Sequence, residues 1–351
     1  MKDLHYFAGY FITKMKRIFT ILPLCLLLFS CTSQSQEEVH FKFNGLSFVG
    51  NPKPVGEESF SKVTDINANA ITLMPFAYGN SNKGSLTYEN LDWQWWGESP
   101  EGVESCIQQA KQKDLKVIVK PQIWFNSGTF TGHHRCETDA DWKSFEEDYT
   151  RFIMIYAELS AKYDLPAFCI GTELCTFAET RPEYWKGLIQ EIRSVYKGKL
   201  TYAANWDSYT RVPFWGELDY VGIDAYFPLS EAKSPVKEDL IEAWDPICGQ
   251  LEAFSNRIGI QVIFMEWGYR STDYCAKTPW ETGEGNAVNL NSQAQAIAAV
   301  FEGVWHKPWF AGGFIWKWFP NGSRGGSDDN RFTPQNKPAE KVISKYFEQF
   351  K

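Results

Sequence analysis

Short runs of apolar and β-branched residues alternate along this chain with longer segments in which apolar residues recur at helical spacing. The short runs have the length and flanking turn residues of strands, and the longer segments have the period of amphipathic helices. Eight strands are predicted, at residues 43–49, 70–76, 116–123, 167–172, 200–206, 220–226, 261–266 and 312–318. Helices are predicted at residues 57–66, 100–113, 139–163, 182–196, 236–257, 292–305 and 338–350, and only the connection around 215–218 is short.

Repeated strand and helix units favour a parallel sheet, and eight of them predict a single (β/α)8 barrel over residues 41–351. No linker divides this region into two domains. In such a barrel the functional side chains lie on the loops that follow the strands. The alternative is a doubly wound open sheet, which is less favoured because no Gly-x-Gly-x-x-Gly motif opens the first predicted helix.

The first residues of the chain have the pattern of an export signal. Lys14, Lys16 and Arg17 precede an apolar run over 18–29, which ends just before Cys31. A run of about a dozen residues is too short to span a bilayer. The segment resembles a bacterial lipoprotein signal, so residues 1–30 are expected to be removed, with Met15 as a second candidate start, and Cys31 to be lipidated.

A polar tether over residues 31–40 then leads to the barrel. The alternative is an ordinary signal peptide that is cut near Cys31. Both interpretations predict an exported protein. The first places it in the bacterial cell envelope, anchored to a membrane through lipid.

The net charge and the aromatic content of the chain narrow the kinds of molecule that it is expected to bind. The net charge is −8 and the chain contains 15 Trp residues. A negative balance argues against nucleic acid as a partner, whereas exposed aromatic rings suit stacking on sugars. For any single Trp, burial in the core is the more common role.

The cysteines and histidines do not define a metal site or a disulfide framework. Cys106, Cys169 and Cys248 fall in predicted helices or strands and are expected to be buried thiols; Cys136, Cys175 and Cys275 fall in loops, where any two could pair. The run from His133 to Cys136, with Asp139 and Asp141, matches no familiar zinc spacing. No metal and no cofactor are predicted.

Two strand-like runs end in glutamate, namely Cys169-Ile170-Gly171-Thr172-Glu173 and the run from Val262 to Glu266. They are the fourth and seventh predicted strands, whose ends face each other across a barrel mouth. Alternation predicts that Ala167, Cys169, Gly171 and Glu173 share the barrel-facing side, as do Val262, Phe264 and Glu266. Two carboxyls so placed indicate a paired acid/base site. The alternative is two rim carboxylates paired with basic residues.

Four motifs carry a resemblance to a known family: Ile170-Gly171-Thr172-Glu173, and the segments 220–228, 264–271 and 332–340. From about residue 43 to its end, the chain resembles the clan A retaining glycoside hydrolases, most closely the β-mannanases of glycoside hydrolase family 113. The resemblance implies that Glu173 is the acid/base and Glu266 the nucleophile. Thr172 stands where many clan A enzymes have asparagine, which family 113 also tends to lack. Gln122 stands where a histidine is expected, so the subsite details and the sugar stay open.

Further side chains are expected around the cleft. Tyr226 ends the sixth strand, where its phenol would bond Glu266, while Asp224 lies one layer deeper. Phe314, Trp316 and Trp318 share one face of the eighth strand, and Trp316 is expected as the floor under the sugar. Other candidates for substrate binding, in decreasing order, are Asn205, Trp206, Lys120, Trp124, Trp93, Trp95 and Trp96. Ordinary packing is the alternative role for each aromatic residue.

Together these features predict an exported glycoside hydrolase that cleaves β-1,4-mannosidic linkages in mannan or manno-oligosaccharides, in endo fashion. The carboxyl of Glu173 is expected to have a raised pKa, because burial and the charge of Glu266 both disfavour its ionisation. The first alternative is hydrolysis of another β-linked glycan, such as glucan, or exo action. The second is a lipid-anchored barrel that binds glycans without cutting them.

Overall fold

The computed structural model describes residues 41–351, except 80–83, 89–90, 126–127, 129 and 282–285. The predicted signal peptide, Cys31 and the tether lie outside the described residues. Within the described part of the chain, no helix combines the length and the apolar character needed to cross a membrane.

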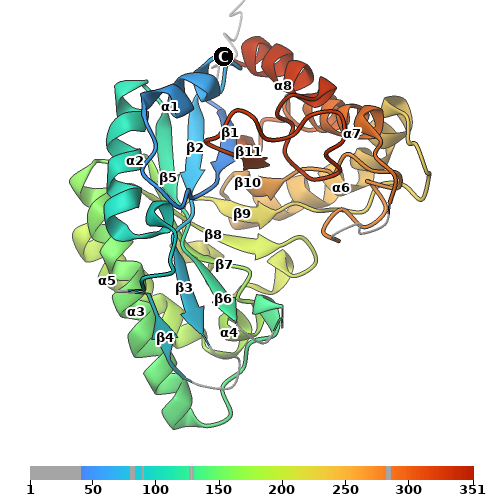
Figure 1. Ribbon diagram of the computed structural model, residues 1–351. Coiled ribbons are helices and arrows are strands. Elements are labelled where there is room, and N and C mark those ends of the chain that lie inside the picture. The colour runs from blue at the N-terminus through green and yellow to red at the C-terminus, as the bar shows by residue number, and fades with distance from the viewer. Residues whose placement is uncertain (1–40, 80–83, 89–90, 126–127, 129, 282–285) are drawn as a thin grey trace, which may run out of the picture. The chain divides into compact units, whose positions relative to one another are not determined.

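A closed barrel of parallel strands forms the centre of the structure (Figure 1). Its strands are β1 (Phe43–Phe48), β2 (Ala70–Leu73), β5 (Lys116–Val119), β7 (Ala167–Thr172), β8 (Lys199–Asn205), β9 (Val221–Asp224), β10 (Val262–Trp267) and β11 (Phe310–Trp318). They follow the order β1-β11-β10-β9-β8-β7-β5-β2 around the ring. The predicted (β/α)8 barrel is therefore confirmed, and each predicted strand position contributes one barrel strand.

Helices surround this barrel (Figure 1): α1 (Glu57–Thr64), α2 (Pro100–Gln112), α3 (Asp139–Lys162), α4 (Cys175–Thr180), α5 (Pro182–Val195), α6 (Lys237–Ile258), α7 (Leu290–Gly303) and α8 (Pro338–Gln349). Local signals fix several helix starts. The Ser99 side chain accepts a hydrogen bond from Gly102 N at the start of α2, where Pro100 occupies the first turn. Thr138 caps α3 in the same way by accepting from Asp141 N.

Two packed layers hold the barrel together. Inside it, buried side chains from several strands form one cluster: Phe43, Ala70, Ile118, Ala167, Cys169, Ala203, Ile263, Met265, Ala311 and Phe314. A larger cluster lies between the strands and the helices. At Gly45 a Cβ atom would lie only 2.2 Å from the Phe314 ring, so this glycine makes room for a large interior side chain.

The second and third predicted strands are each divided in two. After β2 the chain passes Pro75 and forms β3 (Phe76–Gly79); after β5 it passes Pro121 and forms β6 (Gln122–Phe125). Proline has no N–H for the ladder, so it marks the break. β3 and β6 pair in parallel, and β4 (Leu86–Thr87) joins them in a small sheet that continues beyond the barrel (Figure 1).

Alternation within three strands, β10, β7 and β11, was predicted incorrectly. In β10, Ile263 and Met265 belong to the interior cluster, while Val262 and Phe264 pack toward the helices. A register shift between Phe264 and Glu266 then places Glu266 opposite Asp224. The bulge, and not simple alternation, directs this carboxyl inward.

The same correction applies to β7. Ala167 and Cys169 face the interior as predicted, but the register shifts between Cys169 and Thr172. Gly171 consequently faces outward, where a Cβ atom would lie 2.6 Å from the Tyr149 hydroxyl. Strand β11 deviates as well, because Phe314 points inward whereas Trp318 packs in the outer cluster.

Candidate active site

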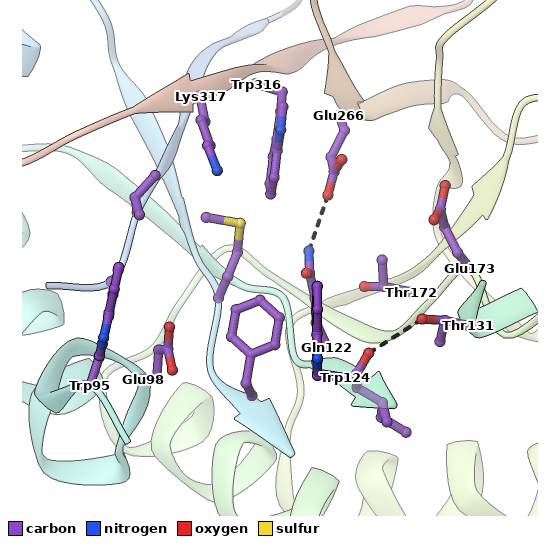
Figure 2. Close-up of a pocket in the computed structure, with 15 residues that line it drawn as sticks. Trp95, Glu98, Gln122, Trp124, Thr131, Thr172, Glu173, Glu266, Trp316 and Lys317 are labelled. Carbon is purple, nitrogen blue, oxygen red and sulfur yellow. Dashed lines mark hydrogen bonds between the residues drawn. The ribbon is translucent and has the colours of Figure 1, made fainter. Parts of the chain in front are cut away.

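A pocket opens at the carboxyl ends of the barrel strands (Figure 2). Its volume is about 370 Å³, within the range of about 300–1,000 Å³ that is typical of small-ligand sites. The polar and aromatic side chains that line it are Phe76, Trp95, Glu98, Gln122, Trp124, Thr131, Thr172, Glu173, Glu266, Trp316 and Lys317. Both predicted glutamates therefore face one cavity.

Glu266 is held by several donors. Tyr226 donates its phenol proton to Glu266 Oε2 over 2.9 Å, as the sequence predicted. Gln122 Nε2 donates to Oε1 over 3.0 Å, and Figure 2 shows this bond across the pocket. Burial and the Glu266 charge raise the pKa of Tyr226 well above its usual range, so this phenol stays protonated as a donor. The carboxylate is thereby oriented and its negative charge is stabilised.

Lys120 lies beneath the pocket and not in it. Its side chain is fully buried, its ammonium contacts Glu266 Oε1, and both Asp224 oxygens lie 3.2 Å from Nζ. Burial disfavours the charged lysine, but Asp224 and Glu266 outweigh it and raise the pKa of Lys120 above its ordinary value. The prediction that Lys120 binds substrate is therefore corrected, because its ammonium is enclosed with carboxyls.

Glu173 follows β7 in a left-handed backbone conformation, with φ of 53°. Its N–H donates to the carbonyl of Ala203 on β8 over 2.8 Å, which fixes the turn. Burial, followed by the negative charge of Glu266, raises the pKa of the Glu173 carboxyl to about 8. The expected direction of this shift is confirmed. Near neutral pH, Glu173 therefore keeps its proton and can act as a proton donor.

The balance of charges around Lys120 supports the assignment of Glu173 as a protonated carboxyl. Glu266 and Asp224 contact the Lys120 ammonium, and Glu173 lies close enough to feel the same charges. Burial and the Glu266 charge also raise the pKa of Asp224 well above its usual range. One ammonium cannot compensate the buried carboxyls of Asp224 and Glu266 together with the half-buried Glu173, so protons are retained in the cluster.

The side of the pocket opposite Glu173 carries aromatic and charged groups. Trp316 and Lys317 project from β11, and Trp95 and Glu98 lie across from them (Figure 2). Tyr78 donates a 2.8 Å hydrogen bond to Glu98, whose carboxyl pKa is raised by burial despite this bond. Burial also lowers the pKa of Lys317. Trp316 and Trp95 are thus available to stack on a flat ligand face.

Some predicted cleft residues lie elsewhere. Trp124 lines the pocket and is 58% exposed, whereas Asn205 and Trp206 are half-buried at the end of β8 and do not line it. Asn205 Oδ1 accepts from the backbone N–H of Trp206. Trp93 contacts Tyr78 edge-on and Trp96 packs against the core, so neither lines this pocket.

Sequence reasoning did not assign the roles of Gln122, Glu98 or Lys317. Gln122 was noted only as a departure from an expected histidine. One signal in the sequence could have identified Gln122 as a site residue. It directly follows Pro121, at the start of an outward extension of the strand. Glu98 and Lys317 lie next to tryptophans that were considered, but a charged residue beside an aromatic one is not distinctive.

The cysteines of the described chain, Cys106, Cys136, Cys169, Cys175, Cys248 and Cys275, are all free. No pair forms among the three loop cysteines. Over the described residues, no group of three or more His, Cys, Asp or Glu side chains is arranged to hold a metal ion. His134 instead stacks on Phe125 at 4.3 Å between ring centroids.

The family model of Glycoside Hydrolase Family 113 matches residues 51–337. The chain belongs to glycoside hydrolase family 113. A search of curated proteins found no match. The resemblance seen in the four motifs is thus confirmed, and the chain is a glycoside hydrolase.

Solved structures agree with the fold of this family 113 chain. The family 113 β-mannanase AaManA from Alicyclobacillus acidocaldarius, in complex with ManMIm, superposes with a TM-score of 0.76 at 24% identity, covering 89% of this chain and 98% of that one. A family 113 β-1,4-mannanase complex matches with a TM-score of 0.76 at 23% identity, covering 88% and 99%. A β-glucuronidase from Bifidobacterium dentium is more distant, with a TM-score of 0.57 at 14% identity, covering 88% and 46%.

Proposed function

We propose that this enzyme hydrolyses β-1,4-mannosidic linkages in mannan or manno-oligosaccharides, within the chain and with retention of anomeric configuration. The observation that carries the proposal is the pairing of Glu173, which keeps its proton to about pH 8, with Glu266, which is held by cationic and neutral donors in the same pocket. The choice of mannan is supported by the β-mannanases of the same family that share the fold.

In the first step, Glu266 attacks the anomeric carbon while Glu173 transfers its proton to the glycosidic oxygen. The bond between that carbon and oxygen breaks, and a glycosyl ester of Glu266 forms. Its formation removes the charge that raised the pKa of Glu173, so Glu173 becomes a base. It then accepts a proton from water, whose oxygen attacks the same carbon and releases Glu266 as a carboxylate.

The surrounding groups favour this sequence. Tyr226 and Gln122 bond different oxygens of Glu266 and aim the carboxylate into the pocket. Lys120 supplies a compensating charge from below, outside the space that the sugar occupies. Hydrogen bonds to an ionised group contribute about 1.5–3 kcal/mol each. The Glu266 carboxylate is therefore aimed into the pocket, and its charge is compensated by Lys120 from outside the pocket.

The decisive experiment compares wild type, Glu173→Ala and Glu266→Ala on linear mannan and manno-oligosaccharides. Loss of general acid catalysis should lower kcat by about 10²–10⁴-fold for Glu173→Ala, and loss of the nucleophile by at least about 10⁴-fold for Glu266→Ala. Added azide should then distinguish the roles. It should give the β-glycosyl azide with Glu173→Ala, because it attacks the ester intermediate, and the α-glycosyl azide with Glu266→Ala.

Other outcomes would reject parts of the proposal. Cleavage of a β-glucan but not of mannan would retain the mechanism and discard the sugar. Release of single sugars from the non-reducing end alone would discard endo action. Equal, zero turnover by wild type and Glu266→Ala, with binding of mannan, would replace the hydrolase with a glycan-binding protein.

We further propose that the enzyme is exported and attached to a membrane through lipid on Cys31. The support is the charged, apolar and small-residue pattern of residues 14–31.

A further inference from the structure

A pair of stacked tryptophans lies at the rim of the barrel, outside the pocket. Trp206 directly follows β8, and Trp280 lies in the segment between β10 and α7. Their ring centroids are 5.1 Å apart and the ring planes differ by 25°. Trp280 remains 44% exposed even with this contact. The outer aromatic surface therefore lacks a full covering partner among the described residues.

The inner ring of the pair is firmly supported. Phe227 contacts Trp206 edge-on at 5.8 Å, and Trp244 packs behind Phe227 at 5.7 Å. The Trp206 N–H donates to Asn205 Oδ1 over 3.0 Å, which fixes the backbone where the ring begins. A rigid aromatic surface loses little conformational entropy when it binds a ligand.

The pair lies on the Glu173 side of the site. β8 neighbours β7 in the barrel, and Glu173 N bonds the carbonyl of Ala203 on β8. Ser208, two residues after Trp206, lies 3.2 Å from the Cys175 sulfur, two residues after Glu173. The chain that carries Trp206 therefore borders the proton donor.

The pocket itself is lined from the other sides. Its residues come from β3, β6, β7, β10 and β11 and from the segments that follow β1, β2, β4, β6 and β7, and none of them follows β8 or β9. A proton donor acts on the oxygen of the leaving group, so the departing part of a glycan must pass Glu173. That direction leads from the enclosed pocket toward the end of β8.

We propose that Trp206 and Trp280 form a binding platform for a sugar ring on the leaving-group side of the glycan. The proposal rests on the proposed function and adds a site to it. The C–H face of a pyranose stacks on the exposed indole, while the sugar before the cleavage point occupies the pocket. Turnover then depends on whether the substrate extends past the cleaved bond.

The test compares two substrates that share the same glycone. Mannotetraose places sugars beyond the cleavage point, whereas β-mannobiosyl fluoride has a single atom as its leaving group. Trp280→Ala should lower kcat/KM for mannotetraose about tenfold and leave kcat/KM for the fluoride unchanged. Trp280→Phe should restore most of the loss. Tyr274→Ala is the matched control, because Tyr274 belongs to the same segment and is 43% exposed.

Each outcome either supports or overturns the proposed Trp206 and Trp280 platform. A loss confined to mannotetraose in Trp280→Ala, with Tyr274→Ala behaving as wild type, supports the platform. Equal loss on both substrates, or no loss on either, overturns it while the hydrolase proposal stands. If wild type cleaves neither substrate, the proposed function itself fails, and the platform inference fails with it. Thermal melts of each variant identify any loss due to misfolding.

Discussion

At the scale of single residues, the site is governed by the sharing of one buried cation among several carboxyls. Lys120 contacts Asp224 and Glu266, and Glu173 lies within reach of their field. The Lys120 contact and the Tyr226 and Gln122 hydrogen bonds all converge on Glu266 and compensate its negative charge. Within the described part of the chain no side chain donates a hydrogen bond to the Glu173 carboxyl, so burial and then the charge of Glu266 determine its pKa. The two roles follow from unequal surroundings of the same side chain.

The first prediction concerns pH. The pKa of Glu173 is raised from 4.5 to about 8, so its proton is present at neutral pH and is lost as the pH rises through that value. The kcat/KM of wild type should therefore fall above about pH 8. The pH profile of kcat/KM on manno-oligosaccharides measures this.

The matched variant for that profile is Glu173→Gln, which cannot lose a carboxyl proton. Its residual activity should be low and should show no alkaline limb near pH 8. If the variant retained the same limb as wild type, another group would be the source of the limb and the assignment of Glu173 would be wrong.

The second prediction concerns Lys120→Met. The substitution removes the buried cation whose charge lowers the pKa of Glu173, so that pKa should rise and the alkaline limb of the kcat/KM profile should move to higher pH. Leaving a buried partner uncompensated costs about 3–5 kcal/mol, so the thermal midpoint should also fall. A pH profile and a thermal melt test the two effects.

Lys317→Met is a useful comparison, because Lys317 lines the same pocket but is not among the charges that shift the pKa of Glu173. It should affect sugar binding more than it affects the alkaline limb. An unchanged alkaline limb in Lys120→Met would mean that Lys120 supports the fold only.

At the scale of elements, the bulges in β7 and β10 explain why strand alternation failed as a guide. The sequence places each glutamate at the end of an apolar run, and this was enough to find both. The inward direction of Glu266 depends on a register shift after Phe264, which alternation cannot show. The break of β2 and β3 at Pro75 was visible in the sequence, but the outward sheet that follows depends on pairing with β6.

The third prediction tests the β7 bulge. Gly171 faces outward, and a Cβ atom there would lie 2.6 Å from the Tyr149 hydroxyl and 2.8 Å from Trp185. Overpacking of this kind costs about 1–3 kcal/mol. Gly171→Ala should therefore lower the thermal midpoint, and it should lower kcat because Glu173 lies two residues away.

The control is Gly187→Ala in α5, where a new Cβ atom would meet nothing within 4 Å. Alanine in a helix is favoured over glycine by about 0.5–1 kcal/mol, so this variant should be slightly more stable and fully active. Equal behaviour of the two variants would show that the contacts around Gly171 do not constrain the strand.

At the scale of the whole molecule, the barrel was predictable because each of its units leaves a signal in the sequence. The pocket was harder to predict, because its walls come from turns and strand extensions that are far apart along the chain. Trp95, Trp124 and Trp316 meet in one cavity only when the ring closes. The contact between Trp206 and Trp280 could not be predicted for the same reason, because no spacing pattern in the sequence relates these two residues.

The chain enters the barrel at one end, and the pocket opens at the other. The amide of Asn44 in β1 donates to the carbonyls of Phe347 and Phe350, and Lys42 bonds the carbonyl of Lys307 just before β11. The described chain thus enters at the amino-terminal end of the strands, whereas the pocket opens at their carboxyl ends. A chain attached to a membrane through its first residues would enter the barrel at the face opposite its cleft.

The last prediction concerns that attachment. If Cys31 carries lipid, the full-length protein expressed in a bacterial host should sediment with membranes and incorporate labelled fatty acid, since lipid chains contribute about 0.8 kcal/mol per buried CH₂. Cys31→Ala should move the protein to the soluble fraction, while Cys25→Ala, in the apolar run, should not. Because the cleft opens away from the point of chain entry, the membrane-bound enzyme and soluble Cys31→Ala should have the same kcat/KM on manno-oligosaccharides. Fatty acid incorporated equally by both variants would show that Cys31 is not the lipidated residue.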